Sequence, residues 1–199
     1  MTGIVLAGGL STRLGTAKAL LRLGDKTFLE LAVSAVSPFC RRIIVVAAAA
    51  GWSLPYLEDY TVVADETPGL GPLGGLVTGL AVSDDEWHLT LACDLPLVRP
   101  KLLELIVREA SGVDAVVPRS GGRLHPLLAA YARSCLAPAR ASLEAGRRAM
   151  TALLDQVQVR FIEEAKLCEV DPDLASFTNV NTWDDYRALR QREQSAADR

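Results

Sequence analysis

Short runs of apolar residues that end at a glycine or an aspartate dominate the first half of the chain. Such runs are typical of strands that are buried on both faces of a parallel sheet. The first run leads directly into a Gly-Gly pair, and later runs end at Asp65 and at Cys93-Asp94. The strands expected in this half are Gly3 to Ala7, Ile43 to Ala48, Thr61 to Ala64 and Trp87 to Ala92.

Between these runs, hydrophobic residues recur at helical spacing. Phe28 to Val36 is the clearest case, and Pro38 closes it because proline cannot continue a helix. Thr182 is placed to cap a last helix. Further helices are expected up to Leu80 and over Lys101 to Ala110, Cys135 to Ala145 and Trp183 to Arg192, with strands over Asp114 to Val117, Pro126 to Tyr131 and Gln158 to Ile162 and a turn at Ser120 to Gly122.

Strands that alternate with helices indicate an α/β sandwich around a mostly parallel central sheet. No linker, low-complexity tract or internal repeat divides the chain, so we expect one domain over residues 1–194. Residues 195–199 are expected to form a frayed tail. The tryptophans Trp52, Trp87 and Trp183 are expected to be packing residues.

Composition and charge argue against several classes of partner. With a net charge of -3, the chain lacks the basic excess of most nucleic-acid binders, so no nucleic acid partner is expected. The longest apolar run, Ile43 to Ala50, is too short to span a membrane. The chain shows no signal peptide and no Cys-x-x-Cys pair, which is typical of a cytoplasmic protein with reduced thiols. The four cysteines are Cys40, Cys93, Cys135 and Cys168.

Unusual chemistry gathers in three loops that follow the first, third and fourth strands. In open α/β sheets, ligands bind beyond the carboxyl ends of the strands. We therefore expect these loops to converge at one edge of the sheet. They are Leu6 to Lys18, Asp65 to Gly75, and Cys93 to Pro96.

The first of these loops combines glycines with two cations. Gly8 and Gly9 remove side chains where backbone must approach a ligand closely, and their amides favour phosphate oxygens. Arg13 and Lys18 supply positive charge to the same phosphates. The alternative is a tight turn with solvated charges, which a glycine pair alone would favour. The loop matches neither the P-loop nor the G-x-G-x-x-G dinucleotide fingerprint.

Asp94 follows an apolar strand in the segment ACDLP. A carboxylate at this edge is the kind of ligand that Mg²⁺ requires when it bridges phosphates. The alternative is an N-cap or turn carboxylate, which is the commoner role of an isolated aspartate. Opposite a phosphate-binding loop, the metal interpretation is favoured. Cys93 beside it is interpreted as a packed thiol, because no histidine partner is evident.

Four segments together resemble the molybdenum cofactor guanylyltransferases: the first loop, GPLGG, ACDLP and FTNVNTWDD. The resemblance covers nearly the whole chain in the right order, although Ile43 to Tyr60 and Val157 to Pro172 match no motif. It implies a Rossmann-like three-layer sandwich that, with Mg²⁺, transfers GMP from GTP to the terminal phosphate of molybdopterin and releases pyrophosphate. It also implies transient contact with other molybdenum cofactor proteins.

The same resemblance implies a role for each matching residue. Asp94 would bind nucleotide and Mg²⁺, Lys18 the phosphates, and Asp65 the nucleoside. From the charges of the residues themselves, we expect Arg13, Lys18 and Asp94 to act in catalysis. The nucleotide-binding set is Leu6, Ala7, Gly8, Gly9, Lys18, Asp65 and Asp94. The acceptor-binding set is Asn179, Asn181 and His125, and Arg147 lies in another segment that resembles the family.

The choice of base depends on one missing methyl group. Related cytidylyltransferases tend to have alanine where this chain has Gly9, and the smaller residue leaves space for a purine. The family often places an asparagine just after the second strand, where this chain has Ala47 to Ala50. The choice between GTP and CTP therefore stays open.

These residues suit in-line attack by a substrate phosphate oxygen on the α-phosphorus of GTP. A phosphate monoester is already anionic and needs no strong general base, so catalysis would come from positioning and charge neutralisation. Two alternatives remain: a nucleotidyltransferase with another phosphate acceptor, such as a sugar 1-phosphate or molybdopterin in a cytidylyltransferase, and a non-catalytic nucleotide-binding module.

Overall fold

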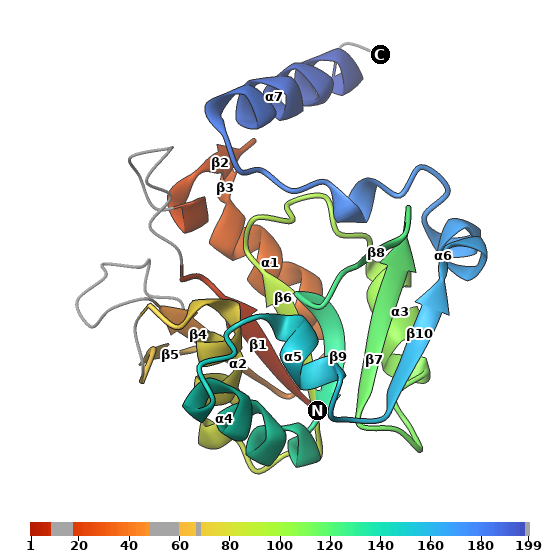
Figure 1. Cartoon of the computed structure of the whole chain (residues 1–199). Coiled ribbons are helices and arrows are strands. Elements are labelled where there is room, and N and C mark those ends of the chain that lie inside the picture. The colour runs from red at the N-terminus through yellow and green to blue at the C-terminus, as the bar shows by residue number, and fades with distance from the viewer. Residues whose placement is uncertain (9–17, 48–59, 67–68, 198–199) are drawn as a thin grey trace.

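A computed structural model describes residues 1–8, 18–47, 60–66 and 69–197 of the chain. Its core is a mixed sheet with the strand order β10-β7-β9-β6-β1-β4-β5, and β8 pairs with β7 (Figure 1). The strands are β1 (Thr2–Leu6), β4 (Arg42–Ala47), β5 (Thr61–Ala64), β6 (Trp87–Ala92), β7 (Ala115–Ser120), β8 (Arg123–Leu124), β9 (Leu128–Ala132) and β10 (Val159–Glu163), and a small hairpin of β2 (Arg22–Leu23) and β3 (Lys26–Thr27) lies apart.

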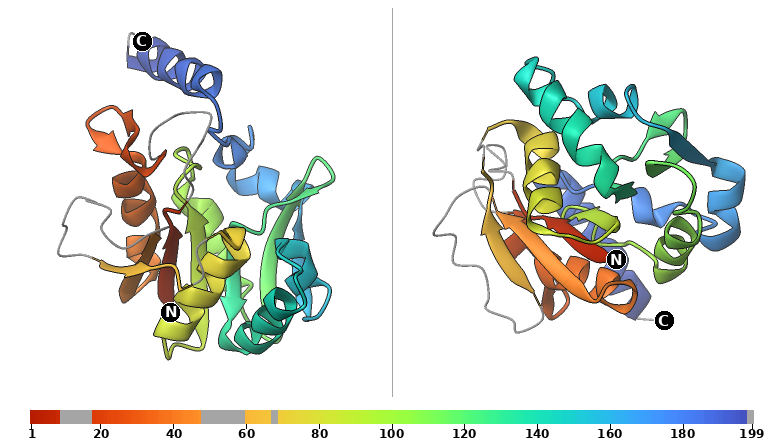
Figure 2. Two further views of the ribbon diagram at one scale, coloured as in Figure 1. Left: turned by 60° about the vertical axis from the view of Figure 1, so that its left-hand side comes forward. Right: turned by 90° about the horizontal axis from the view of Figure 1, so that it is seen from below.

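Helices cover both faces of this sheet (Figures 1 and 2). The α-helices are α1 (Phe28–Val36), α2 (Gly71–Val82), α3 (Pro100–Arg108), α4 (Leu136–Glu144), α5 (Met150–Leu154), α6 (Glu164–Val170) and α7 (Trp183–Ala197). Side chains of α1, α3 and α6 share one buried cluster with Val5, whereas those of α2, α4 and α5 share another with Ile4. Neighbouring residues of β1 thus face opposite layers, as a strand buried on both faces requires. The predicted three-layer sandwich is confirmed.

The topology reverses direction at β1. The chain passes from β1 to β4 and β5 on one side and then returns to β6 on the other side of β1. All three contacts within this group are parallel, with Leu6 level with Ala92 in the register of β1 and β6. A crevice for ligands is expected where the strand order reverses, outside the carboxyl ends of the strands. The loop after β1 and the loop after β6 therefore begin side by side.

The glycine-rich segment after β5 differs from its prediction as a loop. Helix α2 already begins at Gly71, and Pro72 lies in its first turn, where proline is tolerated. Gly75 and Gly79 lie inside the helix because it packs closely on the sheet: a Cβ atom at Gly79 would lie 2.7 Å from Ile4 Cγ2. These two glycines therefore report close helix-to-sheet packing, which sequence alone does not distinguish from turn chemistry.

Most other predicted elements agree with the structure to within a few residues. The turn after β7 is formed by Gly121 and Gly122, whose φ angles are +54° and +72°. Helices α5 and α6 were not predicted. Helix α7 continues to Ala197, beyond the predicted end at Arg192, so part of the expected tail is helical.

Helix α7 projects from the rest of the molecule and rests above the β2–β3 hairpin (Figures 1 and 2). Its contact is a small separate apolar cluster that includes Leu189 from α7, Phe28 from α1 and Val180 from the preceding segment. This segment, residues 171–182, passes over the carboxyl edge of the sheet on its way to α7 (Figure 1). The fold thereby brings the C-terminal segment to the edge where the strand order reverses.

Candidate active site

The candidate site lies at the carboxyl ends of β1 and β6. The amide of Cys93 donates a hydrogen bond to Leu6 O at 3.2 Å, which continues the pairing of these strands by one residue. Asp94 follows in the turn after β6. Lys18 opens the short 3₁₀ helix η1 (Lys18–Leu20), where the described chain resumes after the first loop.

Three predicted site residues meet here although they are far apart in sequence. Lys18 Nζ donates hydrogen bonds to Asp94 Oδ2 at 3.1 Å and to Asn181 Oδ1 at 2.6 Å. The Lys18 and Asp94 side chains are only 16% and 17% exposed. Partial burial weakens solvent screening, so this ion pair interacts more strongly than one on an open surface.

Asp94 also has an oxygen that no described residue satisfies. Its Oδ1 atom is buried and has no hydrogen-bond partner in the described part of the chain. Leaving such an atom unpaired is costly, which points to a ligand that the protein itself does not provide. A carboxylate oxygen suits a hard divalent cation. The described residues contain no cluster of three or more His, Cys, Asp or Glu that could hold a metal.

Cys93 takes no part in this chemistry. The thiol is buried, and burial together with the neighbouring Asp94 carboxylate raises its pKa to about 12. A thiol with so high a pKa remains protonated at neutral pH and is a poor nucleophile or metal ligand. The interpretation of Cys93 as a packed thiol agrees with this environment.

The segment that carries Asn179 and Asn181 is attached to the same turn. Val180 N donates to Asp94 O at 3.0 Å, so the backbone of the segment is tied directly to Asp94. Asn181 itself is exposed apart from its bond to Lys18, and Asn179 is exposed beside it. Both amide side chains therefore lie at the surface, and that of Asn181 contacts the Lys18–Asp94 pair.

A capping box fixes the start of α7 just after Asn181. Asp185 Oδ2 accepts hydrogen bonds from the amides of Asn181 at 2.9 Å and Thr182 at 2.8 Å, and Asp185 N donates to Thr182 Oγ1 at 3.2 Å. The two backbone bonds hold the pKa of the Asp185 carboxyl below its ordinary value. The prediction that Thr182 caps this helix is confirmed.

His125 lies beside the chain that leads to Asn179. Its Nε2 atom is 2.8 Å from Ser120 Oγ, and its ring centroid is 4.2 Å from that of Phe177 in the 3₁₀ helix Ala175–Phe177. Burial lowers the pKa of His125, so its imidazole is neutral at pH 7. A neutral imidazole at this place offers a hydrogen bond to a ligand without adding a charge.

The remaining predicted residues lie around this centre or outside the described residues. Asp65 follows β5, two strands from β1, and its Oδ1 is 3.1 Å from Thr78 Oγ1 on α2. Arg147 is exposed after α4, and Arg148 Nη1 lies 3.5 Å from Gly69 O beside the start of α2.

Some backbone atoms at the end of β1 are already hydrogen-bonded within the sheet. Ala7 N donates to Val46 O at 3.0 Å and Leu6 O accepts from Cys93, so these two atoms are occupied within the sheet. Gly8 is exposed directly after them. Gly9 and Arg13 lie outside the described residues, as do residues 48–50 of the alanine run.

The sequence did not identify the ion pair that positions the C-terminal segment. Asp171 is fully buried, and Arg99 Nε lies 3.0 Å from its Oδ1. Ser176 is bound from both sides, because its amide donates to Asp171 Oδ2 and its hydroxyl accepts from Arg99 N. These bonds join residues 171–176 to the loop that follows Asp94. Asp171 belongs to a stretch without a motif, so no sequence signal was available for it.

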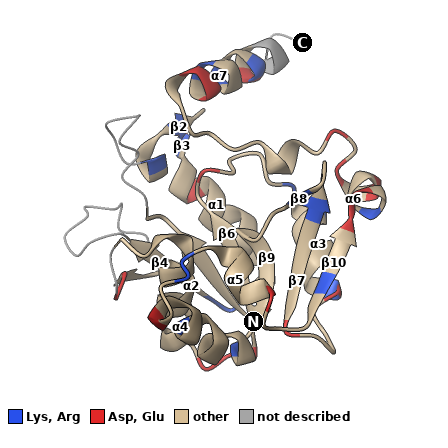
Figure 3. Cartoon of the chain, in the orientation of Figure 1, with Lys and Arg blue, Asp and Glu red and all other residues tan. Residues whose placement is uncertain are grey.

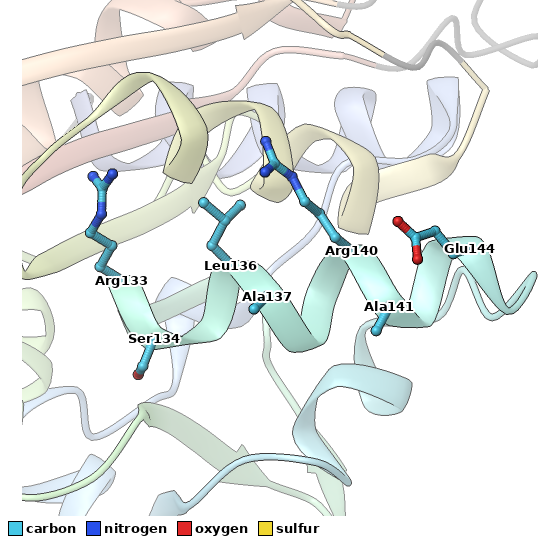
Figure 4. A pocket seen from close by; sticks show the side chains of 7 residues that line it. All are labelled: Arg133, Ser134, Leu136, Ala137, Arg140, Ala141 and Glu144. Atoms are coloured by element: carbon cyan, nitrogen blue, oxygen red, sulfur yellow. The ribbon is translucent and has the colours of Figure 1, made fainter.

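A concave region lies on the opposite side of the molecule from the candidate site. It has a volume of about 470 Å³ and runs along α4, where Arg133, Leu136 and Arg140 line it (Figure 4). Ala132, just before it, pairs with Trp87 at the amino end of β6. This groove therefore begins at the edge of the sheet opposite to Asp94 and is not part of the candidate site.

Among the described helices, none is long and apolar enough to cross a membrane.

Comparison with known proteins identifies the family. Residues 3–160 match the MobA-like NTP transferase domain. The chain is 37% identical to a probable molybdenum cofactor guanylyltransferase of Chloroflexus aggregans, over 96% of this chain and 93% of that protein. It is 35% identical to the molybdenum cofactor guanylyltransferase of Desulfosudis oleivorans, over 92% of this chain and 90% of that protein.

A solved structure agrees over the full length. Molybdopterin-guanine dinucleotide biosynthesis protein A from Archaeoglobus fulgidus superposes with a TM-score of 0.84 at 28% identity, covering 98% of this chain and 100% of that one. The shared domain, the identity over nearly the whole length and the Lys18–Asp94–Asn181 cluster lead to one conclusion. The chain is a nucleotidyltransferase that belongs to the MobA-like NTP transferases, in the molybdenum cofactor guanylyltransferase family.

Proposed function

We propose that this protein transfers GMP from GTP to the terminal phosphate of molybdopterin, forming the guanine dinucleotide cofactor and pyrophosphate. The observation that carries the proposal is the meeting of Lys18, Asp94 and Asn181 at the carboxyl ends of β1 and β6. This cluster puts a cation and a carboxylate beside an exposed amide, which suits a reaction between two phosphate-bearing substrates. The names of the relatives agree with both substrates.

Nucleotidyltransferases of this family generally use a divalent metal. We propose Mg²⁺ as that metal and Asp94 as its protein ligand, since the buried Oδ1 atom lacks any partner among the described residues. Mg²⁺ commonly binds through one or two carboxylates and completes its coordination with water and substrate phosphates. When bound, it neutralises phosphate charge and holds the phosphate groups of the substrates together.

In the reaction, an oxygen of the acceptor phosphate attacks the α-phosphorus of GTP. A new P–O bond joins the two substrates while the bond from the α-phosphorus to the bridging oxygen breaks, and its electron pair leaves with pyrophosphate. The attacking oxygen is already anionic, so no residue needs to remove a proton. The Lys18 ammonium offsets the negative charge that develops, and Asp94 orients that ammonium through the 3.1 Å contact.

Other residues would bind the two substrates. On the nucleotide side, we propose backbone contacts from Leu6, Ala7, Gly8 and Gly9, a phosphate contact from Arg13, and a nucleoside contact from Asp65. On the acceptor side, we propose Asn179, Asn181 and His125. The exposed amides of Asn179 and Asn181 and the placement of His125 beside Phe177 support the acceptor set.

We further propose that the protein works in the cytoplasm on small molecules, without a nucleic acid or membrane partner and with transient contacts to other molybdenum cofactor proteins. The net charge of -3 and the four free cysteines support this setting.

Incubation with molybdopterin, MgCl₂ and each NTP in turn, followed by identification of the products, tests the proposal. We expect the guanine dinucleotide and pyrophosphate from GTP, with little product from CTP, because glycine at position 9 leaves space for a purine. Equal products from CTP and GTP would contradict the choice of guanine. Pyrophosphate release with a sugar 1-phosphate but not with molybdopterin would contradict the choice of acceptor.

A further inference from the structure

An exposed tryptophan stands next to the candidate site. Among the described residues, Leu20, Val62 and Trp183 are the large hydrophobic side chains with high exposure, and 41% of Trp183 is accessible to solvent. The sequence predicted a packing role for Trp183, and its side chain nevertheless keeps a large share of its surface in solvent. An indole two residues from Asn181 offers a flat apolar surface on which a planar ring of a substrate can stack.

The backbone of Trp183 is fixed relative to Asp94. Trp183 is the first residue of α7 and follows Asn181 by two positions. Val180 is tied to Asp94 O, Asn181 to Lys18, and the capping box holds the turn between them and the helix. The indole is thus carried by the same rigid turn that presents Asn181 to the phosphate-binding lysine.

The Trp183 ring packs against an aromatic neighbour on the same helix. The Trp183 and Tyr186 rings meet edge-on, with centroids 5.8 Å apart and an interplanar angle of 70°. Tyr186 is held in turn by a 2.7 Å hydrogen bond from its hydroxyl to Arg22 O and by an edge contact with Phe28. A braced aromatic ring loses little conformational entropy when a ligand stacks on it.

The charges on α7 do not indicate that this helix binds a charged macromolecule. Basic and acidic residues are mixed along the helix (Figure 3), with Asp184 paired to Arg187 and Glu193 to Arg190. A mixed, self-paired surface does not favour a strongly charged macromolecule. The exposed indole is therefore the distinctive feature at this end of the helix.

We infer that Trp183 forms an aromatic wall of the acceptor subsite, on which the flat fused ring of a pterin stacks. The inference rests on the proposed function, because that function requires the acceptor phosphate to reach Lys18 and Asp94 while the rest of the acceptor extends past Asn181. A fused heteroaromatic ring gains from stacking on indole in the way that nucleobases do.

The experiment compares Trp183→Ala and Trp183→Phe with the wild type, varying molybdopterin at saturating GTP and Mg²⁺ and then the reverse. Trp183→Ala is expected to raise the KM for molybdopterin about 10-fold, and Trp183→Phe much less, since stacking on one ring contributes about that factor. The KM for GTP and kcat are expected to stay within about 2-fold. Arg187→Ala, one turn along the same helix, is the matched control and is expected to change none of these values.

Binding of pterin-6-carboxylate, measured by calorimetry without GTP, separates this inference from the proposed function. Wild type and Trp183→Phe are expected to bind it, and Trp183→Ala about 10-fold more weakly. An unchanged molybdopterin KM in Trp183→Ala, or pterin binding that is equal in all variants, would overturn the role of Trp183. If wild type binds the pterin through Trp183 but forms no dinucleotide from molybdopterin, the proposed function fails and the aromatic wall stands.

Discussion

The two carboxylate oxygens of Asp94 lie in different environments. One oxygen contacts Lys18, while the other is buried without a partner among the described residues. We predict that Asp94→Asn lowers kcat by at least about 10²-fold, because the amide removes both the negative charge and an oxygen suited to a cation. Titration of activity with Mg²⁺ measures this, with the exposed and distant Glu163→Gln as the control. An unchanged Mg²⁺ titration would place the metal elsewhere.

Lys18 is the cation at the centre of the cluster. Lys18→Ala is predicted to slow the chemical step by about 10²- to 10³-fold, since it removes one positive donor from the developing charge and leaves the Asp94 carboxylate unpaired. Single-turnover rates at saturating substrates isolate that step from binding. Lys101→Ala, which removes an exposed lysine at the start of α3, is expected to retain the wild-type rate. Near-wild-type turnover of Lys18→Ala would exclude Lys18 from the mechanism.

Individual site residues could be predicted where they follow an expected strand. Asp94 and Lys18 could be identified because each belongs to a loop that follows an apolar run, and parallel strands bring such loops together. The Arg99–Asp171 ion pair could not be identified, because its partners are 72 positions apart and neither lies in a recognisable pattern. A buried pair of this kind depends on tertiary structure that sequence spacing does not encode.

At the scale of elements, α2 shows that glycine can indicate either a turn or close packing of a helix against a sheet. Gly75 was expected to end a loop, yet it lies in the helix against Leu6, while Gly79, within the expected helix, packs against Ile4 of β1. Strand boundaries were easier to predict, since a run buried on both faces of a sheet is uniformly apolar. Close approach of a helix to a sheet is a three-dimensional requirement, and composition alone cannot separate it from a turn.

Gly79→Ala tests this packing. Alanine favours the helix by about 1 kcal/mol, but its methyl would lie 2.7 Å from Ile4 Cγ2, so we predict a net loss of about 1–2 kcal/mol in the free energy of unfolding. Urea denaturation measures it. Gly75→Ala is the control, because its nearest neighbour is the movable end of Leu6, at 3.1 Å. In an Ile4→Ala background, Gly79→Ala should no longer destabilise; a loss that persists there would refute the packing account.

At the scale of the whole molecule, the path of the C-terminal segment was the hardest feature to predict. The α/β alternation indicated the layers, and the reversal of strand order places Leu6 beside Ala92. Residues 171–182 then cross the edge of the sheet and deliver Asn181 to Lys18 over 163 positions of sequence. That crossing is held by individual contacts to Asp94 O and to Arg99, and not by strand pairing, so only the resemblance of FTNVNTWDD to the family, and no periodicity, indicated that Asn181 belongs to the site.

At the opposite edge of the sheet, a buried carboxylate and its hydrogen bonds stabilise the fold and take no part in the candidate site. Asp85, only 8% exposed, accepts hydrogen bonds from Thr2 Oγ1 at 2.7 Å and from the Arg41 guanidinium, and the Met1 amino group lies 3.5 Å away. These contacts hold the pKa of Asp85 well below its ordinary value. A carboxyl whose pKa is depressed on folding stabilises the protein above its unfolded pKa of about 3.9, and this contribution is lost as the pH falls towards the folded pKa.

Asp85→Asn is therefore predicted to lower the free energy of unfolding by about 2 kcal/mol at pH 7 and to flatten its decline below about pH 4, relative to wild type. Denaturant titrations between pH 7 and pH 3 measure both effects. Asp84→Asn, at a fully exposed neighbouring position, is the control and is expected to keep the wild-type acid decline. Because Asp85 lies at the amino edge of the sheet, kcat at pH 7 should not change in the folded variant. A parallel acid decline in Asp85→Asn and wild type would show that this cluster does not couple stability to pH.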